Sequence, residues 1–249
     1  MFIPVIELFR NFNVKPRSIL HVGAHQAEES ESYDKFFDVP VIWVEAHPEL
    51  CSDLRKRLNS VTNTIVEACV LDIDDKIVTF NVSTNSQSSS VLDFGTHSNY
   101  YPDVLVTNKL SMKTQKLETI LMGREIPDFI NLDIQGVELK ALKSLGSLIN
   151  QVDVIYTEVN KKEVYKGCDL INDIDLFLSS NGFRRVCTRW VLGAGWGDAL
   201  YLSKKVKQRT FRQLFRCKIQ TFKFYTPQIK SKLKSNVRFL IQKLGSIKQ

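Results

Sequence analysis

The sequence has few cysteines and no long hydrophobic run, and these two absences exclude several classes of protein. Its five cysteines form no CxxC pair, so they indicate neither a disulfide framework nor a zinc knuckle. Cysteines scattered in this way favour a reducing, cytoplasmic environment. No stretch approaches the roughly 18 apolar residues that a membrane-spanning helix needs, and Glu7 comes too early for a secretory signal. We therefore expect a protein that is soluble or peripheral to a membrane.

Acidic residues are missing from the C-terminal part of the chain. From Lys204 onward there are 14 Lys and Arg residues and no Asp or Glu, whereas residues 1–203 carry a formal charge of −7. The net charge of +7 for all 249 residues therefore describes neither part. The length and the hydrophobic content of 43% fit one large globular domain. We expect an acidic domain over residues 1–203 and a basic tail over residues 204–249, with separate functions.

Apolar runs alternate with amphipathic segments along the acidic domain. Strands are expected at residues 17–23, 41–46, 64–72, 76–84, 128–133, 152–159, 182–190 and 198–204, with helices between several of them. The last two expected strands are close in sequence. This order predicts an α/β protein with a mostly parallel sheet and an antiparallel edge strand. Residues 85–111 are rich in Ser, Asn, Gly and Pro, and we expect a long functional loop there.

Residues with suitable chemistry stand at the carboxyl ends of the expected strands, where ligands bind in open α/β sheets. Gly23 ends the first strand, and its lack of a Cβ lets backbone N–H groups approach a ligand. Glu45 ends the second strand 22 residues later, near the spacing at which an acid binds a nucleotide ribose. Asp72 and Asp133 end later strands and are candidates for adenine or ribose contacts and for the reacting centre. Each residue alone has a structural explanation, but their joint placement indicates a nucleotide-like ligand.

The turn after the first expected strand argues against NAD as this ligand. The segment lacks the GxGxxG fingerprint, and the acids Glu28 and Glu29 would repel a pyrophosphate. A ligand with ribose and adenine but no phosphate suits such an acidic turn better. S-adenosylmethionine is a ligand of this kind, and its sulfonium group is a cation.

Five segments of the sequence resemble the FkbM-type methyltransferases. They are LHVGAH (20–25), WVEAHPE (43–49), KLETIL (116–121), DFINLDIQGVELKAL (128–142) and VIYTEV (154–159). The fourth segment is the most specific, although Gln135 replaces the usual Glu of its D-x-E-G-x-E pattern. The resemblance implies a class I methyltransferase Rossmann-like fold, S-adenosylmethionine as cofactor, and O-methylation of a sugar, glycan or small-molecule hydroxyl. The residues expected to bind the cofactor are Gly23, His25, Glu45, Ala46, Asp72 and Asp133.

A hydroxyl acceptor needs a base, and the sequence offers several candidates for this role. Asp133 is the first, because it ends a central strand, although a role in anchoring the cofactor or capping a helix is equally consistent. His97 lies beside two tyrosines in the expected loop and titrates near neutral pH. Glu138 is a third candidate for the catalytic site, and both it and Glu158 also suit the positioning of a substrate hydroxyl. His25 is a rival base next to the cofactor turn.

The basic tail contains two stretches with apolar residues at helical spacing, separated by Thr226-Pro227. Basic amphipathic helices bind anionic membranes, so a peripheral membrane contact is one expectation. Packing on the acidic domain or on a partner subunit is an alternative. A third is tethering of nucleic acid, in which case the enzyme would be an RNA-modifying methyltransferase. A binding module without catalysis is the remaining interpretation if S-adenosylmethionine does not bind.

Overall fold

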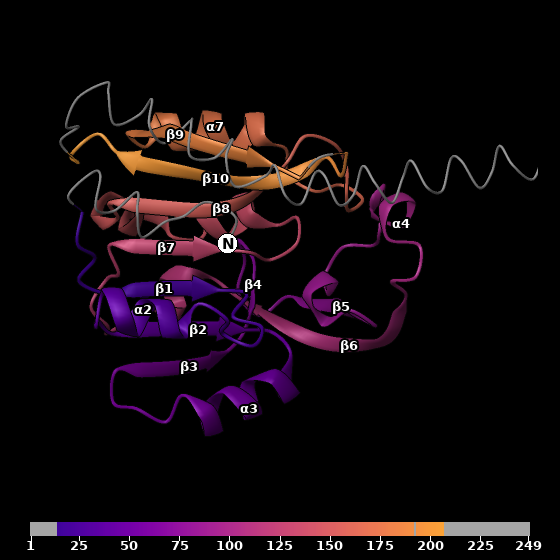
Figure 1. The fold of residues 1–249 in the computed structure, drawn as a ribbon, viewed down its shortest axis with the longest axis horizontal. Helices are drawn as coiled ribbons and strands as arrows, with labels where there is room; N and C mark the ends of the chain where they lie inside the picture. Colours follow the sequence, from indigo (N-terminus) through magenta and orange to yellow (C-terminus); the bar gives the residue numbers. More distant parts are fainter. Residues whose placement is uncertain (1–13, 192, 207–249) are drawn as a thin grey trace, which may run out of the picture. The chain divides into compact units, whose positions relative to one another are not determined.

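Most of the expected strands lie in one seven-stranded sheet of a computed structural model that describes residues 14–191 and 193–206 (Figure 1). In spatial order the strands are β3 (Asn63–Glu67), β2 (Val41–Glu45), β1 (Ile19–Val22), β7 (Phe129–Leu132), β8 (Val154–Asn160), β10 (Trp196–Ser203) and β9 (Phe183–Trp190). The first five are parallel, and β10 is antiparallel to both of its neighbours. The predicted fold class is confirmed. Most of the basic tail lies outside the described residues.

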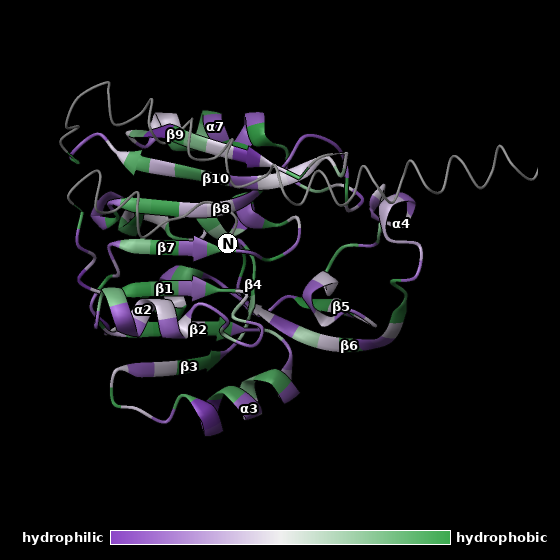
Figure 2. Cartoon of the chain, in the orientation of Figure 1, coloured by the Kyte–Doolittle hydropathy of each residue, from purple (hydrophilic) through white to green (hydrophobic). Residues whose placement is uncertain are grey.

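Helices cover both faces of this sheet because successive side chains of each strand point to opposite sides. On one face, Tyr33 of α2 (Ser30–Phe36) stacks on Trp43 at 5.6 Å between ring centroids and lies 6.0 Å from His21. The other face packs against α6 (Glu138–Lys143) and α7 (Ile171–Ser180) through buried aliphatic side chains. The central strands accordingly carry long hydrophobic stretches, which are green in Figure 2. This double burial matches the near-continuous apolar runs of the sequence.

The remaining helices follow the local signals of the sequence. Helix α3 (Pro48–Arg57) begins at a proline, which suits the first helical position, and its basic side chains are in the last turn, where they complement the helix dipole. Helix α2 begins only at Ser30, because His25 and Ala27 in the preceding turn have positive φ angles of 46° and 51°. The shorter helices are α4 (His97–Tyr100), α5 (Leu117–Ile120) and the 3₁₀ segments η1 (Ser86–Ser88) and η2 (Gly146–Gln151).

A second, three-stranded sheet corrects two of the predictions. It consists of β4 (Cys69–Val70), β6 (Val106–Gln115) and β5 (Ile77–Ser83), in that order. The single strand expected over residues 64–72 is therefore divided at Ala68 between two sheets. The loop expected over residues 85–111 ends earlier, because its last residues begin β6, which pairs antiparallel with β5. This small sheet lies beyond the carboxyl ends of the parallel strands and forms one side of the site (Figure 1).

Candidate active site

The end of β1 and the end of β7 touch at Gly23. Gly23 has a φ angle of +82°, and a Cβ built on it would lie 1.8 Å from the carbonyl oxygen of Asp133. Only glycine fits a position with both constraints. The N–H of Gly23 donates to the carbonyl of Val44 at 2.9 Å, so β2 joins the same contact. Three strand ends are thus held together at the point where the sequence analysis placed a ligand.

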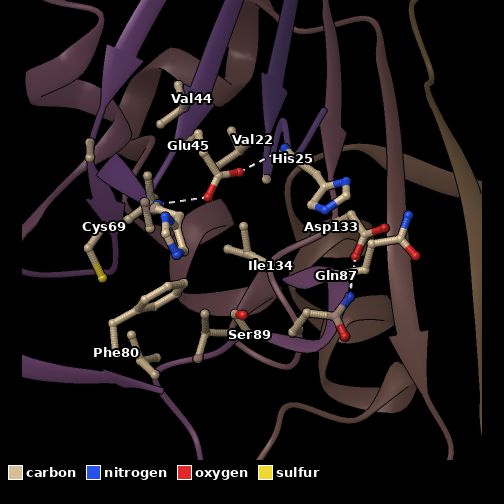
Figure 3. Close-up of a pocket in the computed structure, with 18 of the residues that line it drawn as sticks. Val22, His25, Val44, Glu45, Cys69, Phe80, Gln87, Ser89, Asp133 and Ile134 are labelled. Carbon is tan, nitrogen blue, oxygen red and sulfur yellow. Dashed lines mark hydrogen bonds between the residues drawn. The ribbon is translucent and has the colours of Figure 1, made fainter. Parts of the chain in front are cut away.

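Glu45 at the end of β2 is the most buried acid of this junction. Its side chain is 7% exposed, and its carboxylate accepts the N–H groups of His25 at 2.7 Å and His47 at 2.8 Å. Figure 3 shows the carboxylate lying between these two donors. Each carboxylate oxygen of Glu45 accepts one of these N–H groups, so each oxygen can still accept a hydrogen bond from a hydroxyl group.

A pocket of about 600 Å³, open to solvent, lies beyond these strand ends. One end is apolar and is lined by Phe80 of β5 and by Cys69 and Val70 of β4. The opposite end is polar and includes His25 and Asp133 (Figure 3). Glu45 lines the pocket between the two ends. We refer to this space as the first pocket.

A second pocket of about 1380 Å³ adjoins the first. The residues that line both are Gly23, His25, Gln87, Asp133 and Gln135. Five acids line the second pocket: Glu28, Glu29, Asp133, Glu158 and Asp198. Its other side chains include rings from His97, Tyr101, Tyr156 and Trp196. Among the described residues, no Lys or Arg lines either pocket, so both favour ligands that are neutral or cationic.

Asp133 lies at the border of the two pockets, within a cluster of carboxylates. The amide of Gln135 donates to Oδ1 of Asp133 at 2.5 Å and to Oε2 of Glu158 at 3.1 Å. The side chain of Asp133 is open to the pocket solvent, but it lies deep among protein atoms. This burial, together with the charge of Asp198, raises the pKa of Asp133 to about 6. Desolvation and the neighbouring acids also raise the pKa of Glu158 well above its ordinary value.

His97 is buried rather than exposed, contrary to what its position in a polar loop suggests. It is 4% exposed, and its ring stacks on Phe94 at 4.3 Å between centroids. Its Nε2 lies 3.1 Å from Oγ of Ser88, whereas Nδ1 has no hydrogen-bond partner among the described residues. Burial lowers the pKa of His97, so the ring is neutral at pH 7. A neutral imidazole that lines the second pocket is able to accept a proton.

The structure brings most of the predicted site residues together and leaves two outside. Gly23, His25, Glu45, Ala46 and Asp133 line the first pocket, and His97 lines the second. Asp72 lines neither, because β4 ends at Val70 and Asp72 lies in an exposed bend.

Glu138 also lines neither pocket. It is fully buried, and its carboxylate accepts the N–H groups of Ile134 at 3.1 Å and Gly136 at 3.0 Å. It therefore holds the turn that follows β7.

Several lining residues were not singled out from the sequence. Phe80 and Cys69 contribute the apolar end of the first pocket, but the sequence gives no sign that β4 and β5 leave the main sheet. Gln87 lies in the polar segment that was interpreted only as a loop. Tyr156 and Asp198 come from β8 and β10, whose antiparallel pairing places them at the site. A single apolar run contains no information on this pairing.

Every helix in the part of the chain that the structure describes is too short or too polar to cross a membrane. No group of three or more His, Cys, Asp and Glu side chains in that part of the chain has an arrangement that could hold a metal ion.

Comparison with known proteins identifies a family. The model of the methyltransferase FkbM domain matches residues 21–185, which is most of the acidic domain. No curated protein matches the chain in sequence.

Similar solved structures include the magnesium protoporphyrin IX methyltransferase of Synechocystis with bound SAM, with 11% identity, a TM-score of 0.45 and coverage of 81% of this chain and 76% of that chain. A putative RNA methyltransferase of Pyrococcus horikoshii has 12% identity and a TM-score of 0.45, with coverage of 81% and 83%. A putative tRNA (m1A22) methyltransferase of Streptococcus pneumoniae has 13% identity and a TM-score of 0.44, with coverage of 99% and 89%. None of these likenesses bears on the acceptor.

Proposed function

Because this chain belongs to the FkbM family of S-adenosylmethionine-dependent methyltransferases, we propose that it methylates a hydroxyl of a sugar, glycan or other small molecule. The observation that carries this proposal is the meeting of the two pockets at Asp133. The first pocket holds the cofactor, and the second holds the acceptor. The methyl group then passes between them beside an acid that ionises near neutral pH.

The first pocket suits the adenine, the ribose and the sulfonium of S-adenosylmethionine. Phe80 and Cys69 offer an apolar site for the adenine ring, and the Glu45 carboxylate accepts the ribose hydroxyls. Asp133 places negative charge at the far end, where a sulfonium is favoured. The absence of a Cβ at Gly23 lets the ends of β1 and β7 come together beside this pocket, which both Gly23 and Asp133 line. No basic residue of the described chain lines this pocket, which fits a ligand without phosphate.

The residues of the second pocket then prepare the acceptor. S-adenosylmethionine, when bound, supplies a methyl carbon that the acceptor oxygen attacks in line with the departing sulfur, which leaves as a neutral thioether. Asp133 accepts the hydroxyl proton as the O–C bond forms, and becomes a neutral carboxyl group. The rings of Tyr101 and Trp196 pack against the acceptor. His97 is the alternative proton acceptor, since it also lines the second pocket.

The acidic lining supports a small neutral acceptor over RNA. A nucleic acid carries one negative charge per nucleotide and binds through Lys and Arg. The second pocket presents five carboxylates and, among the described residues, no base. The RNA alternative would therefore depend on the tail beyond residue 206, which lies outside the described residues. It remains an outcome of the acceptor screen below.

The proposal is tested in two steps. Radiolabelled S-adenosylmethionine is first incubated with nucleotide sugars, oligosaccharides and RNA, and transfer to a carbohydrate hydroxyl is expected. Label in RNA alone, with a steep dependence on salt, would establish the alternative.

Asp133→Asn and His97→Ala are then compared at saturating cofactor, with the exposed Asp53→Asn as the matched control. We expect Asp133→Asn to lose at least 100-fold in turnover, an order-of-magnitude figure for general-base catalysis. Full turnover in both variants would remove both residues as the base.

A further inference from the structure

Gln135 occupies an unusual position in the turn that follows β7. Its φ angle of +56° is in the left-handed region, which side chains with a Cβ rarely adopt. The turn is fixed on both sides, because Ser90 Oγ donates to the carbonyl of Gln135 at 2.8 Å and Gly136 N–H donates to Glu138. The backbone of Gln135 is therefore strained in this turn, and its side chain lies at the border of the two pockets.

The amide of Gln135 is oriented by three hydrogen bonds. Its Oε1 accepts the hydroxyl of Tyr165 at 2.6 Å, and Tyr165 is 1% exposed. Its Nε2 donates to Oδ1 of Asp133 at 2.5 Å and to Oε2 of Glu158 at 3.1 Å. The reverse orientation would place the amide oxygen against the carboxylate of Asp133, which has no proton to donate when it is ionised. One side chain thus uses its two N–H donors on two acids from different strands.

We propose that Gln135 is a positioning residue for methyl transfer: its amide holds Asp133 and Glu158 as a pair and leaves the second oxygen of Asp133 for the acceptor hydroxyl. This inference rests on the proposed function, in which Asp133 accepts the proton. Within the described residues, Oδ2 of Asp133 accepts no hydrogen bond. Tyr165, whose hydroxyl anchors the Gln135 amide, also lies against the ring of His97, with 5.5 Å between the ring centroids. It therefore contacts the alternative base as well.

The surroundings of Asp133 make this donor important. Acids face it from several elements: Glu158 on β8, Asp198 on β10, Glu138 on α6 and Glu29 before α2. Each of them, together with burial, favours the neutral form of Asp133. The bond from Gln135 opposes this effect by stabilising the charged form. Loss of that bond should therefore raise the pKa of Asp133 and lower the fraction of the residue that is able to accept a proton.

Direct titration of Asp133 tests the proposal without cofactor or acceptor. The full chain is labelled with ¹³C at the aspartate carboxyl carbons, and the Asp133 signal is assigned by its loss in Asp133→Asn. In Gln135→Met, which preserves length but donates nothing, we expect the titration midpoint to rise by about one pH unit. Gln87→Met is the matched control, because Gln87 lines the same two pockets but donates to Glu28. It is expected to leave the midpoint unchanged.

A second variant keeps the test decisive if Gln135→Met fails to fold. Tyr165→Phe removes the hydroxyl that anchors the amide, together with its longer bond to the carbonyl of Ser88 at 3.3 Å, and should move the midpoint in the same direction by a smaller amount. A midpoint in Gln135→Met equal to that of Gln87→Met would overturn the proposal, as would an unchanged midpoint in Tyr165→Phe when only that variant folds. Failure of the proposed function is a separate result, seen as absence of cofactor binding or methyl transfer while the midpoint still shifts.

Discussion

The backbone N–H of His25 donates to Oε2 of Glu45 over 2.7 Å, so the turn after β1 and the last residue of β2 form one unit. The other oxygen of Glu45 accepts the N–H of His47 in the same way. A carboxylate held by two backbone donors keeps a fixed position, and it remains able to accept hydroxyl groups from a ligand. Cofactor affinity should therefore depend on the charge and the geometry of this single side chain.

Replacement of Glu45 by Ala should lower the affinity for S-adenosylmethionine by well over tenfold. The substitution removes the acceptor for the ribose hydroxyls and also releases the turn at His25. Isothermal titration calorimetry measures the loss, and circular dichroism reports whether the fold is preserved. Glu67→Ala is the control, because Glu67 ends the neighbouring strand β3 and lines neither pocket. Equal affinities for wild type and Glu45→Ala would remove Glu45 from the cofactor site.

The Phe80 ring should affect only the nucleoside end of the cofactor. Stacking of a base on an aromatic side chain is worth about 1–3 kcal/mol, so Phe80→Ala should weaken binding by about tenfold. Adenosine alone should lose affinity by the same factor as S-adenosylmethionine, since both carry the adenine ring. A variant that weakens the binding of S-adenosylmethionine but not of adenosine would place the adenine elsewhere. Competition binding with both ligands gives the comparison.

Two glycines with similar backbone angles should respond differently to substitution by alanine. Gly23 and Gly123 have φ angles of +82° and +73°, but only Gly23 lies against other atoms. Gly123→Ala should lower the free energy of unfolding by about 1–2 kcal/mol, because alanine is strained in a left-handed conformation even where no other atom lies near. In Gly23→Ala the new Cβ also collides with the carbonyl of Asp133, so the free energy of unfolding should fall by at least about 2 kcal/mol more. Urea denaturation of both variants measures the difference, and equal losses would contradict the close contact.

Stability should fall as the pH rises through the range in which Glu138 ionises. Burial raises the pKa of Glu138 from its ordinary value of 4.5 to about 7 in the folded protein. The unfolded chain therefore releases this proton at lower pH than the folded protein does. Between about pH 4.5 and 7 the free energy of unfolding should decrease, by up to about 1.4 kcal/mol per pH unit for this one group.

Glu138→Gln provides the check on this pH dependence. A neutral amide does not titrate, so the variant should lose the part of the slope between pH 4.5 and 7 that Glu138 contributes, whatever its absolute stability. The control is Glu118→Gln, because Glu118 is an exposed acid in the first turn of α5 and should retain the wild-type slope. Parallel urea denaturation series across this pH range decide the matter. A slope in Glu138→Gln equal to that of the wild type would show that Glu138 is ionised in the fold throughout.

The sequence predicted the main sheet well because its strands are buried on both faces. Such strands appear as continuous apolar runs, and the run at residues 152–159 corresponds closely to β8. The ends of β1, β2 and β7 were also predicted, so Gly23, Glu45 and Asp133 were correctly expected at one edge. The residues of β4 and β5 were not predicted to form a separate sheet. A two-residue strand such as β4 has too few side chains to show a pattern.

The roles of Gln135 and His97 could not be derived from the sequence for a different reason. Their surroundings consist of residues distant in the chain, including Tyr165, Glu158 and Ser88. The polar composition of residues 85–111 suggested solvent exposure, but His97 is buried between aromatic rings. Asp72 was misplaced because the apolar run before it was taken as one strand. In each case tertiary contacts, rather than local preference, determined the position of the side chain.

The position of β10 between β8 and β9 affects how the domain is completed during synthesis. Among the residues that the structure describes, β10 is the last strand along the chain, yet it is flanked on both sides by strands made before it. Until residue 203 has left the ribosome, β8 and β9 have no partner between them and expose two rows of backbone hydrogen-bonding groups. Such edges readily pair with other chains. The wall of the acidic pocket formed by Trp196 and Asp198 is therefore absent until β10 pairs with β8 and β9.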